Sequence, residues 1–84
     1  MNYTFPKTVF SDQNSVADQL EHVRSEMIEV QTAMTVRDIH LELMDQYHSL
    51  ETLFRILEKI HSPEYVDQLV EDTQKKNESR GYYV

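Results

Sequence analysis

An apolar stripe with helical spacing constrains the first half of this chain more than any other feature. Six apolar residues recur at intervals of four, three, four, three and four: Val16, Leu20, Val23, Met27, Val30 and Met34. This alternation places all six on one side of an α-helix. With Ser11 or Asp12 as the N-cap, the stripe predicts a first helix of about residues 12–34.

A second helix is predicted over residues 36–61. Thr35 and Asp38 resemble a capping box at its start, with aspartate in place of the more usual glutamate or glutamine. Its apolar face is formed by Leu43, Met44, Tyr47, Leu50, Phe54, Leu57 and Ile60. The pattern stops before Ser62 and Pro63.

The same two residues predict the start of a third helix over residues 63–80. Ser62 is a suitable N-cap, and proline is favoured in the first helical position. Gly81 fits the position just past the helix end. The expected buried side of this helix consists of Tyr65, Val66, Leu69 and Val70.

The composition favours an all-α domain. One glycine and two prolines are too few for a β-sandwich, and 39% hydrophobic residues are too many for a disordered tail. We expect one domain over residues 1–84, with residues 1–11 as an N-terminal extension and residues 81–84 as a tail. A three-helix chain with so long an apolar stripe is expected to dimerise, so that two chains complete a four-helix-bundle core.

Charge and hydropathy exclude several classes of partner. A net charge of −7 argues against sequence-independent nucleic-acid binding, which requires a basic surface. No segment approaches the ~20 apolar residues of a membrane span, and the first residues lack the apolar run of a signal peptide. We therefore expect a cytoplasmic protein that binds neither nucleic acid nor membrane. The absence of cysteine excludes a thiolate metal site.

Two pairs of acidic residues are the candidate functional site. Glu26 and Glu29 lie in the first predicted helix, and Glu42 and Asp45 lie in the second. Each pair is spaced i, i+3, so its two carboxylates point to the same side of a helix. Two such helices side by side would gather four hard oxygen ligands, as a Mg²⁺ site requires. The alternative is that these acids are the solvated flanks of ordinary amphipathic helices.

The motifs around these acids resemble those of MazG-like nucleotide pyrophosphohydrolases, in particular the small phage-type members of this all-α NTP pyrophosphatase superfamily. The resemblance covers residues 15–83. It is carried by the acidic runs SEMIE and ELMD with twelve residues between them, by the stretch DQYHSLET, and by a C-terminal motif KNESRGYY. Ser25 stands where many members carry a further glutamate.

The resemblance implies an enzyme that cleaves nucleoside triphosphates between the α and β phosphates, giving a monophosphate and pyrophosphate. It implies that Glu26, Glu29, Glu42 and Asp45 hold Mg²⁺, with Mn²⁺ as a substitute. One of the two glutamates of the first helix would accept the proton of the attacking water, and we favour Glu29 over Glu26.

The same resemblance assigns the substrate contacts and the assembly. Lys76 and Arg80 would clamp phosphate oxygens, Asn77 would bind the base or sugar, and His48 would support the metal ligands or the substrate. Cations at a helix end are also explained by the helix dipole, and a histidine at a helix seam needs no function. Small members form dimers or dimers of dimers, in which the basic motif reaches the acidic site of a neighbour.

Two other functions remain open at this level. The first alternative is a non-catalytic helical interaction module that binds a partner through the Leu20–Met34 stripe. The second is a family member that binds nucleotide without cleaving it.

The sequence assigns no role to His22, His40 and His61, which show no metal-ligand spacing with each other.

Overall fold

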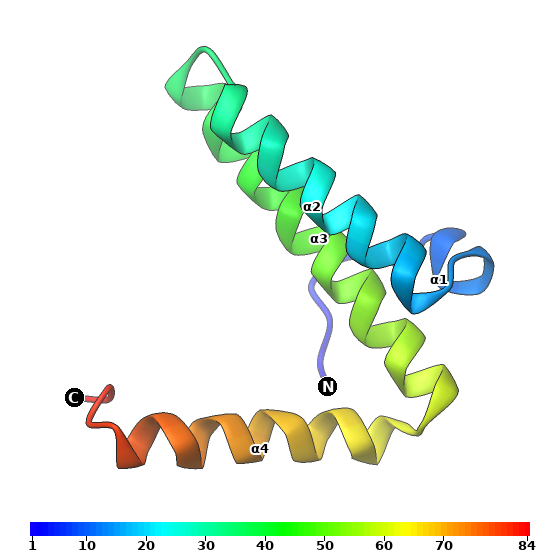
Figure 1. Ribbon diagram of the computed structural model, residues 1–84, viewed down its shortest axis with the longest axis vertical. Helices are drawn as coiled ribbons and strands as arrows, with labels where there is room; N and C mark the ends of the chain where they lie inside the picture. The colour runs from blue at the N-terminus through cyan, green and yellow to red at the C-terminus, as the bar shows by residue number, and fades with distance from the viewer.

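The computed structural model describes all 84 residues and contains four helices and no strand: α1 (Phe10–Gln13), α2 (Val16–Thr32), α3 (Val36–Ile60) and α4 (Pro63–Ser79). The all-α prediction is confirmed. Helices α2 and α3 form an antiparallel hairpin, and α4 turns back at the end of α3 and diverges from the hairpin (Figure 1). None of the four helices combines the length and the apolar character needed to cross a membrane.

The predicted starts of α3 and α4 are confirmed by their caps. The Thr35 hydroxyl accepts a hydrogen bond of 3.1 Å from the Asp38 backbone N–H. The Ser62 hydroxyl accepts one of 3.1 Å from the Tyr65 backbone N–H, and Pro63 occupies the first helical position. Each hydroxyl satisfies one of the backbone donors that a helix start leaves free.

The end of α4 depends on the single glycine of the chain. Gly81 has a φ of 73°, a left-handed conformation that glycine adopts easily because it has no Cβ and that other residues disfavour. This turn lets the Gly81 N–H donate to the Glu78 carbonyl at 3.0 Å and the Tyr82 N–H donate to the Asn77 carbonyl at 3.1 Å. The pair of bonds is the Schellman motif, so the predicted C-terminal role of Gly81 is confirmed.

The prediction of three helices is wrong, because the predicted first helix is interrupted. Asn14 is extended, with φ −91° and ψ 141°, and it separates α1 from α2. The N-cap of α2 is Ser15, which forms a capping box with Asp18 through bonds of 3.1 and 3.3 Å. The predicted caps Ser11 and Asp12 lie inside α1.

The N-terminal extension packs along α3 instead of extending into solvent. The backbone N–H groups of Thr4 and Phe5 each donate to the buried Glu51 carboxylate at 2.8 Å. Arg55 donates to the Phe5 carbonyl at 2.9 Å. Because α3 supplies these partners, the extension is fixed to one side of the hairpin without forming regular structure.

The apolar core of a single chain is small. Only three apolar side chains are buried, Leu53, Ile56 and Val66. Much of the stripe that was expected to be buried is open, and Met34 is 92% exposed. The expected buried side of α4 is also largely uncovered, because Tyr65, Leu69 and Val70 are all exposed. An isolated chain thus leaves many large apolar side chains in contact with solvent.

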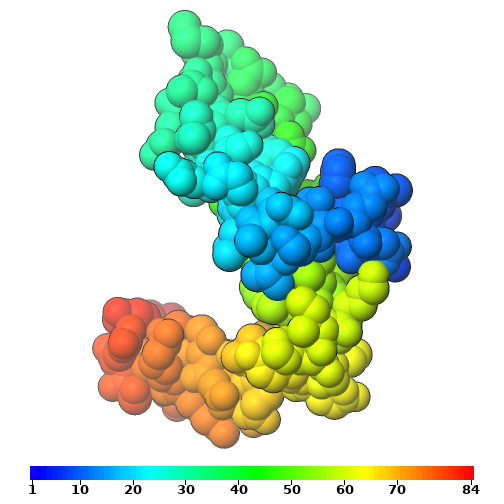
Figure 2. Space-filling view, turned by 45° about the vertical axis from the view of Figure 1, so that its right-hand side comes forward, coloured from blue at the N-terminus to red at the C-terminus, as the bar shows by residue number.

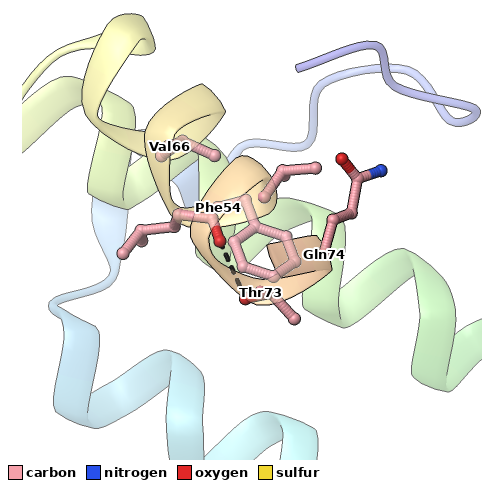
Figure 3. A pocket seen from close by; sticks show the side chains of 6 residues that line it. Phe54, Val66, Thr73 and Gln74 are labelled. Carbon is pink, nitrogen blue, oxygen red and sulfur yellow. Dashed lines mark hydrogen bonds between the residues drawn. The ribbon is translucent and has the colours of Figure 1, made fainter. Parts of the chain in front are cut away.

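An apolar groove lies where α3 and α4 meet. It has a volume of about 250 Å³ and is lined by Phe54, Val66, Leu69, Val70, Thr73 and Gln74. The Thr73 hydroxyl donates to the Leu69 carbonyl at 2.7 Å beside the Phe54 ring (Figure 3). Beyond this groove, α4 projects from the hairpin as an arm (Figure 2).

Truncation of Ile56 is expected to destabilise the fold. Ile56 is 3% exposed, so an Ile56→Ala change leaves a cavity in a core of only three residues and should lower the free energy of unfolding by about 3 kcal/mol. Urea denaturation measures this difference. The matched control is Ile60→Ala, since Ile60 is 59% exposed on the same helix. Equal losses for the two variants would contradict the location of the core.

Candidate metal centre

The hairpin brings three of the four predicted carboxylates into one cluster. One oxygen each from Glu26, Glu29 and Glu42 lies within 4.8 Å of the others. Asp45 is outside this distance, but it borders the same cavity as Glu26. Since i, i+3 spacing aligns each pair and the helices pack side by side, acids from two distant segments face one space.

This proximity changes the acidity of two of the carboxyls. Burial raises the pKa of Glu26 to about 7, and the adjacent Glu29, Asp45 and Glu42 carboxylates add to the effect. The Glu26 side chain is 15% exposed. The pKa of Glu42 is also raised, first by burial and then by the charges of Glu29 and Asp45. Like charges that are partly removed from water favour the protonated form.

Two oxygens of the cluster are buried without a hydrogen-bond donor. They are Oε2 of Glu26 and Oε2 of Glu42. A buried acceptor that receives no hydrogen bond is costly, and a cation removes that cost. Carboxylate oxygens are the ligands that Mg²⁺ prefers, so the residues present fit this ion. When bound there, a Mg²⁺ ion would neutralise phosphate charge and lower the pKa of a bound water.

Two residues beside the cluster were not expected from the sequence. His22 Nε2 lies 3.2 Å from Oε1 of Glu26, so it holds the buried carboxylate from one turn earlier in α2. Gln46 lies one turn after Glu42, and its buried Oε1 has no hydrogen-bond partner. Their i, i+4 spacing from the two glutamates was the available signal.

The predicted substrate contacts are divided between two parts of the molecule. His48 borders the same cavity as Glu26 and Asp45. Lys76, Asn77 and Arg80 lie at the C-terminal end of α4, well away from the hairpin (Figure 1). Neither Lys76 nor Arg80 forms an ion pair with an acid of its own chain. One chain therefore does not bring the basic motif to the carboxylates.

Comparison with known proteins gives no match: no family model, no curated protein and no solved structure is similar to the chain.

The raised pKa of Glu26 predicts a pH-dependent stability of the metal-free protein. The folded state favours the protonated form of Glu26 more than the unfolded chain does. Protonation of Glu26 therefore stabilises the fold fully below the ordinary glutamate pKa of 4.5, and this stabilisation is lost as the pH rises toward about 7. The carboxylates around it are Glu29 from α2 and Glu42 and Asp45 from α3, and the His22 ring from α2 contacts it. We expect the melting temperature to fall between about pH 5 and about pH 8.

Neutralising Glu26 should remove most of this dependence. In metal-free buffer at about pH 8, Glu26→Gln should melt about 5 °C above the unmodified chain, while the two should be similar at about pH 5. The control is Glu21→Gln, which neutralises an exposed glutamate in the same helix. A Glu26→Gln profile parallel to that of the unmodified chain would contradict the electrostatic argument.

Proposed function

We propose that this protein is a Mg²⁺-dependent, MazG-like nucleoside triphosphate pyrophosphohydrolase. The observation that carries the proposal is the convergence of Glu26, Glu29 and Glu42 within 4.8 Å, with two of their oxygens buried and unpartnered. Solvated flanks of amphipathic helices need neither this convergence nor this burial. The order of the acidic and basic motifs in the sequence gives independent support.

The four carboxylates bind the metal ion in this proposal, and one of them also accepts a proton. Glu26, Glu29, Glu42 and Asp45 hold Mg²⁺, or Mn²⁺ in its place. In the reaction, the oxygen of a water bonds to the α-phosphorus, the bond to the α–β bridging oxygen breaks, and pyrophosphate leaves. The water's proton passes to Glu29, because this side chain is exposed, whereas Glu26 is largely buried and held by His22.

A second copy of the chain completes the protein in this proposal. Three buried apolar residues are too small a core for a chain of 84 residues, and the exposed stripe and the α3–α4 groove offer apolar surface for a partner copy. Lys76 and Arg80, which are unpaired in their own chain, would lie against the carboxylates of the partner. Opposite charges would then meet across the interface.

The exposed apolar surface also favours a second candidate, a non-catalytic helical interaction module. Such a protein would use the same stripe and groove to bind a different protein, and it would not need clustered carboxylates. The melting temperature separates the two functions. Mg²⁺ stabilises a protein with a metal site by linkage, by about 5 °C at saturating concentrations, and leaves the module unchanged.

Hydrolysis is tested by pyrophosphate release from a panel of ribo- and deoxynucleoside triphosphates, with and without Mg²⁺. Asp45→Asn should lower Mg²⁺-dependent release by about a hundredfold or more, because it removes a charged metal ligand while keeping the side-chain shape. Asp72→Asn is the control, since Asp72 is an exposed α4 residue bonded only to Gln68. Full activity of Asp45→Asn would remove the metal assignment. Nucleotide-dependent stabilisation without product would indicate a binding protein.

Mixing two inactive variants tests whether the basic motif acts on a neighbouring chain. Asp45→Asn lacks a carboxylate and Arg80→Ala lacks a phosphate contact, so each alone should be inactive. In a mixed dimer one of the two sites has both residues intact, and equal mixing should restore about a quarter of the original activity. No recovery after confirmed subunit exchange would contradict a shared site.

A further inference from the structure

The four carboxylates are bordered by two cavities. Glu26 and Asp45 border one of about 140 Å³. Glu29 and Glu42 border the other, of about 300 Å³. A ligand whose phosphate groups lie at the carboxylates has these two places for the rest of its structure.

The linings of the two cavities differ in chemistry. The smaller cavity is lined by three rings, those of Phe10, His22 and His48. The larger one has no ring and adds a further acid, Asp38, beside the hairpin turn. Flat rings bind flat rings by stacking, with little dependence on the ligand's exact identity. We name the smaller one the ring cavity.

The N-terminal extension holds one wall of the ring cavity in place. The Ser11 hydroxyl donates to the Thr8 carbonyl at 2.8 Å, and the hydroxyls of Thr8 and Thr52 are 3.3 Å apart. These contacts fix the start of α1 against α3. The Phe10 ring is thereby held with its centroid 5.7 Å from that of His22 and 32° from parallel, although Phe10 is 41% exposed.

His48 is held from the other side. Its ring is stacked on Phe5 with centroids 4.5 Å apart and an angle of 17° between the planes. Its Nε2 lies 3.4 Å from the Pro6 carbonyl. These contacts use one face of the histidine ring and one of its two nitrogens.

Gln19 supplies a fixed polar edge to the ring cavity. It is 1% exposed, its Nε2 donates to the Ser49 carbonyl at 3.0 Å, and its Oε1 accepts from Asn14 at 2.9 Å. These bonds orient the amide and use one of its two N–H groups and one of its two lone pairs. One donor and one acceptor of the amide remain unused, and an amide with both is suited to the edge of an unpaired base.

We propose that the ring cavity binds the nucleobase of the substrate, with the Phe10 ring stacking on it and the Gln19 amide bonding to its edge. The identity of the ligand as a nucleotide rests on the proposed function. A cavity of about 140 Å³ holds one ring system and not a whole nucleotide, so sugar and phosphates extend along the carboxylates. The N-terminal extension is then part of the substrate site.

The first test removes the ring and then restores it. Phe10→Leu keeps an apolar side chain but loses the stacking face, and should raise the KM for nucleoside triphosphates about tenfold with an unchanged kcat. Phe10→Tyr restores the ring and should keep the original KM. Val9→Ala is the control, because Val9 is an exposed neighbour that does not border the cavity. Equal KM values for Phe10→Leu and Phe10→Tyr would overturn the proposal.

The second test observes binding without hydrolysis. Uridine and adenosine monophosphates should shift the NMR signals of the Gln19 side-chain amide in the unmodified chain and in Phe10→Tyr, and much less in Phe10→Leu. Ribose 5-phosphate, which has no base, should leave these signals in place.

The two tests together separate the ring cavity from the proposed function. Hydrolysis with no Gln19 shift would overturn the ring cavity and leave the hydrolase standing. A Gln19 shift with no hydrolysis of any triphosphate would support the ring cavity and overturn the hydrolase. Equal shifts from ribose 5-phosphate would show that no base is bound, which also overturns the ring cavity.

Discussion

The antiparallel packing of α2 against α3 forces carboxylates that repel one another into a shared, partly buried space. The fold accommodates this repulsion by holding a proton near neutral pH, as the pKa of about 7 for Glu26 indicates. In the proposed function, a divalent cation would perform the same neutralisation with more charge and would coordinate the unpartnered oxygens. Cation binding and the stability of the hairpin are therefore coupled in this account.

Helix α3 connects this charged seam to the rest of the chain. Its N-terminal half carries Glu42 and Asp45, its centre binds the N-terminal extension through Glu51, and its C-terminal half packs against α4 beside Phe54. The extension and the carboxylates consequently share one rigid support. The arm α4 is different, since one chain covers only the part nearest α3 (Figure 1). In the proposed dimer, the uncovered apolar side of this arm would pack on a second copy, and its unpaired basic end would meet the acidic cluster of that copy.

The helix ends that depend on local hydrogen bonds were predictable from the sequence. The features that depend on contacts between distant residues were not. Thr35, Ser62 and Gly81 act through bonds within a few residues, so their roles follow from the sequence. The break at Asn14 was missed because Ser11, Asp12 and Ser15 are all good caps, and periodicity does not choose among them. The path of the N-terminal extension depends on Glu51, some 46 residues away, and an irregular segment has no repeating pattern to reveal it. The acid cluster was predictable from i, i+3 spacing. The ring cavity beside it was not, because one of its walls forms only when the extension packs on α3.

The most direct test of the metal centre is a crystal grown with Mn²⁺, which substitutes for Mg²⁺ and scatters X-rays anomalously. An anomalous peak among the oxygens of Glu26, Glu29 and Glu42 is the predicted result, and it should vanish or become much weaker in crystals of Glu29→Gln, which removes one of these three charges. Ordered carboxylates with no peak between them at saturating Mn²⁺, or peaks only on the exposed acids of α4, would contradict the account.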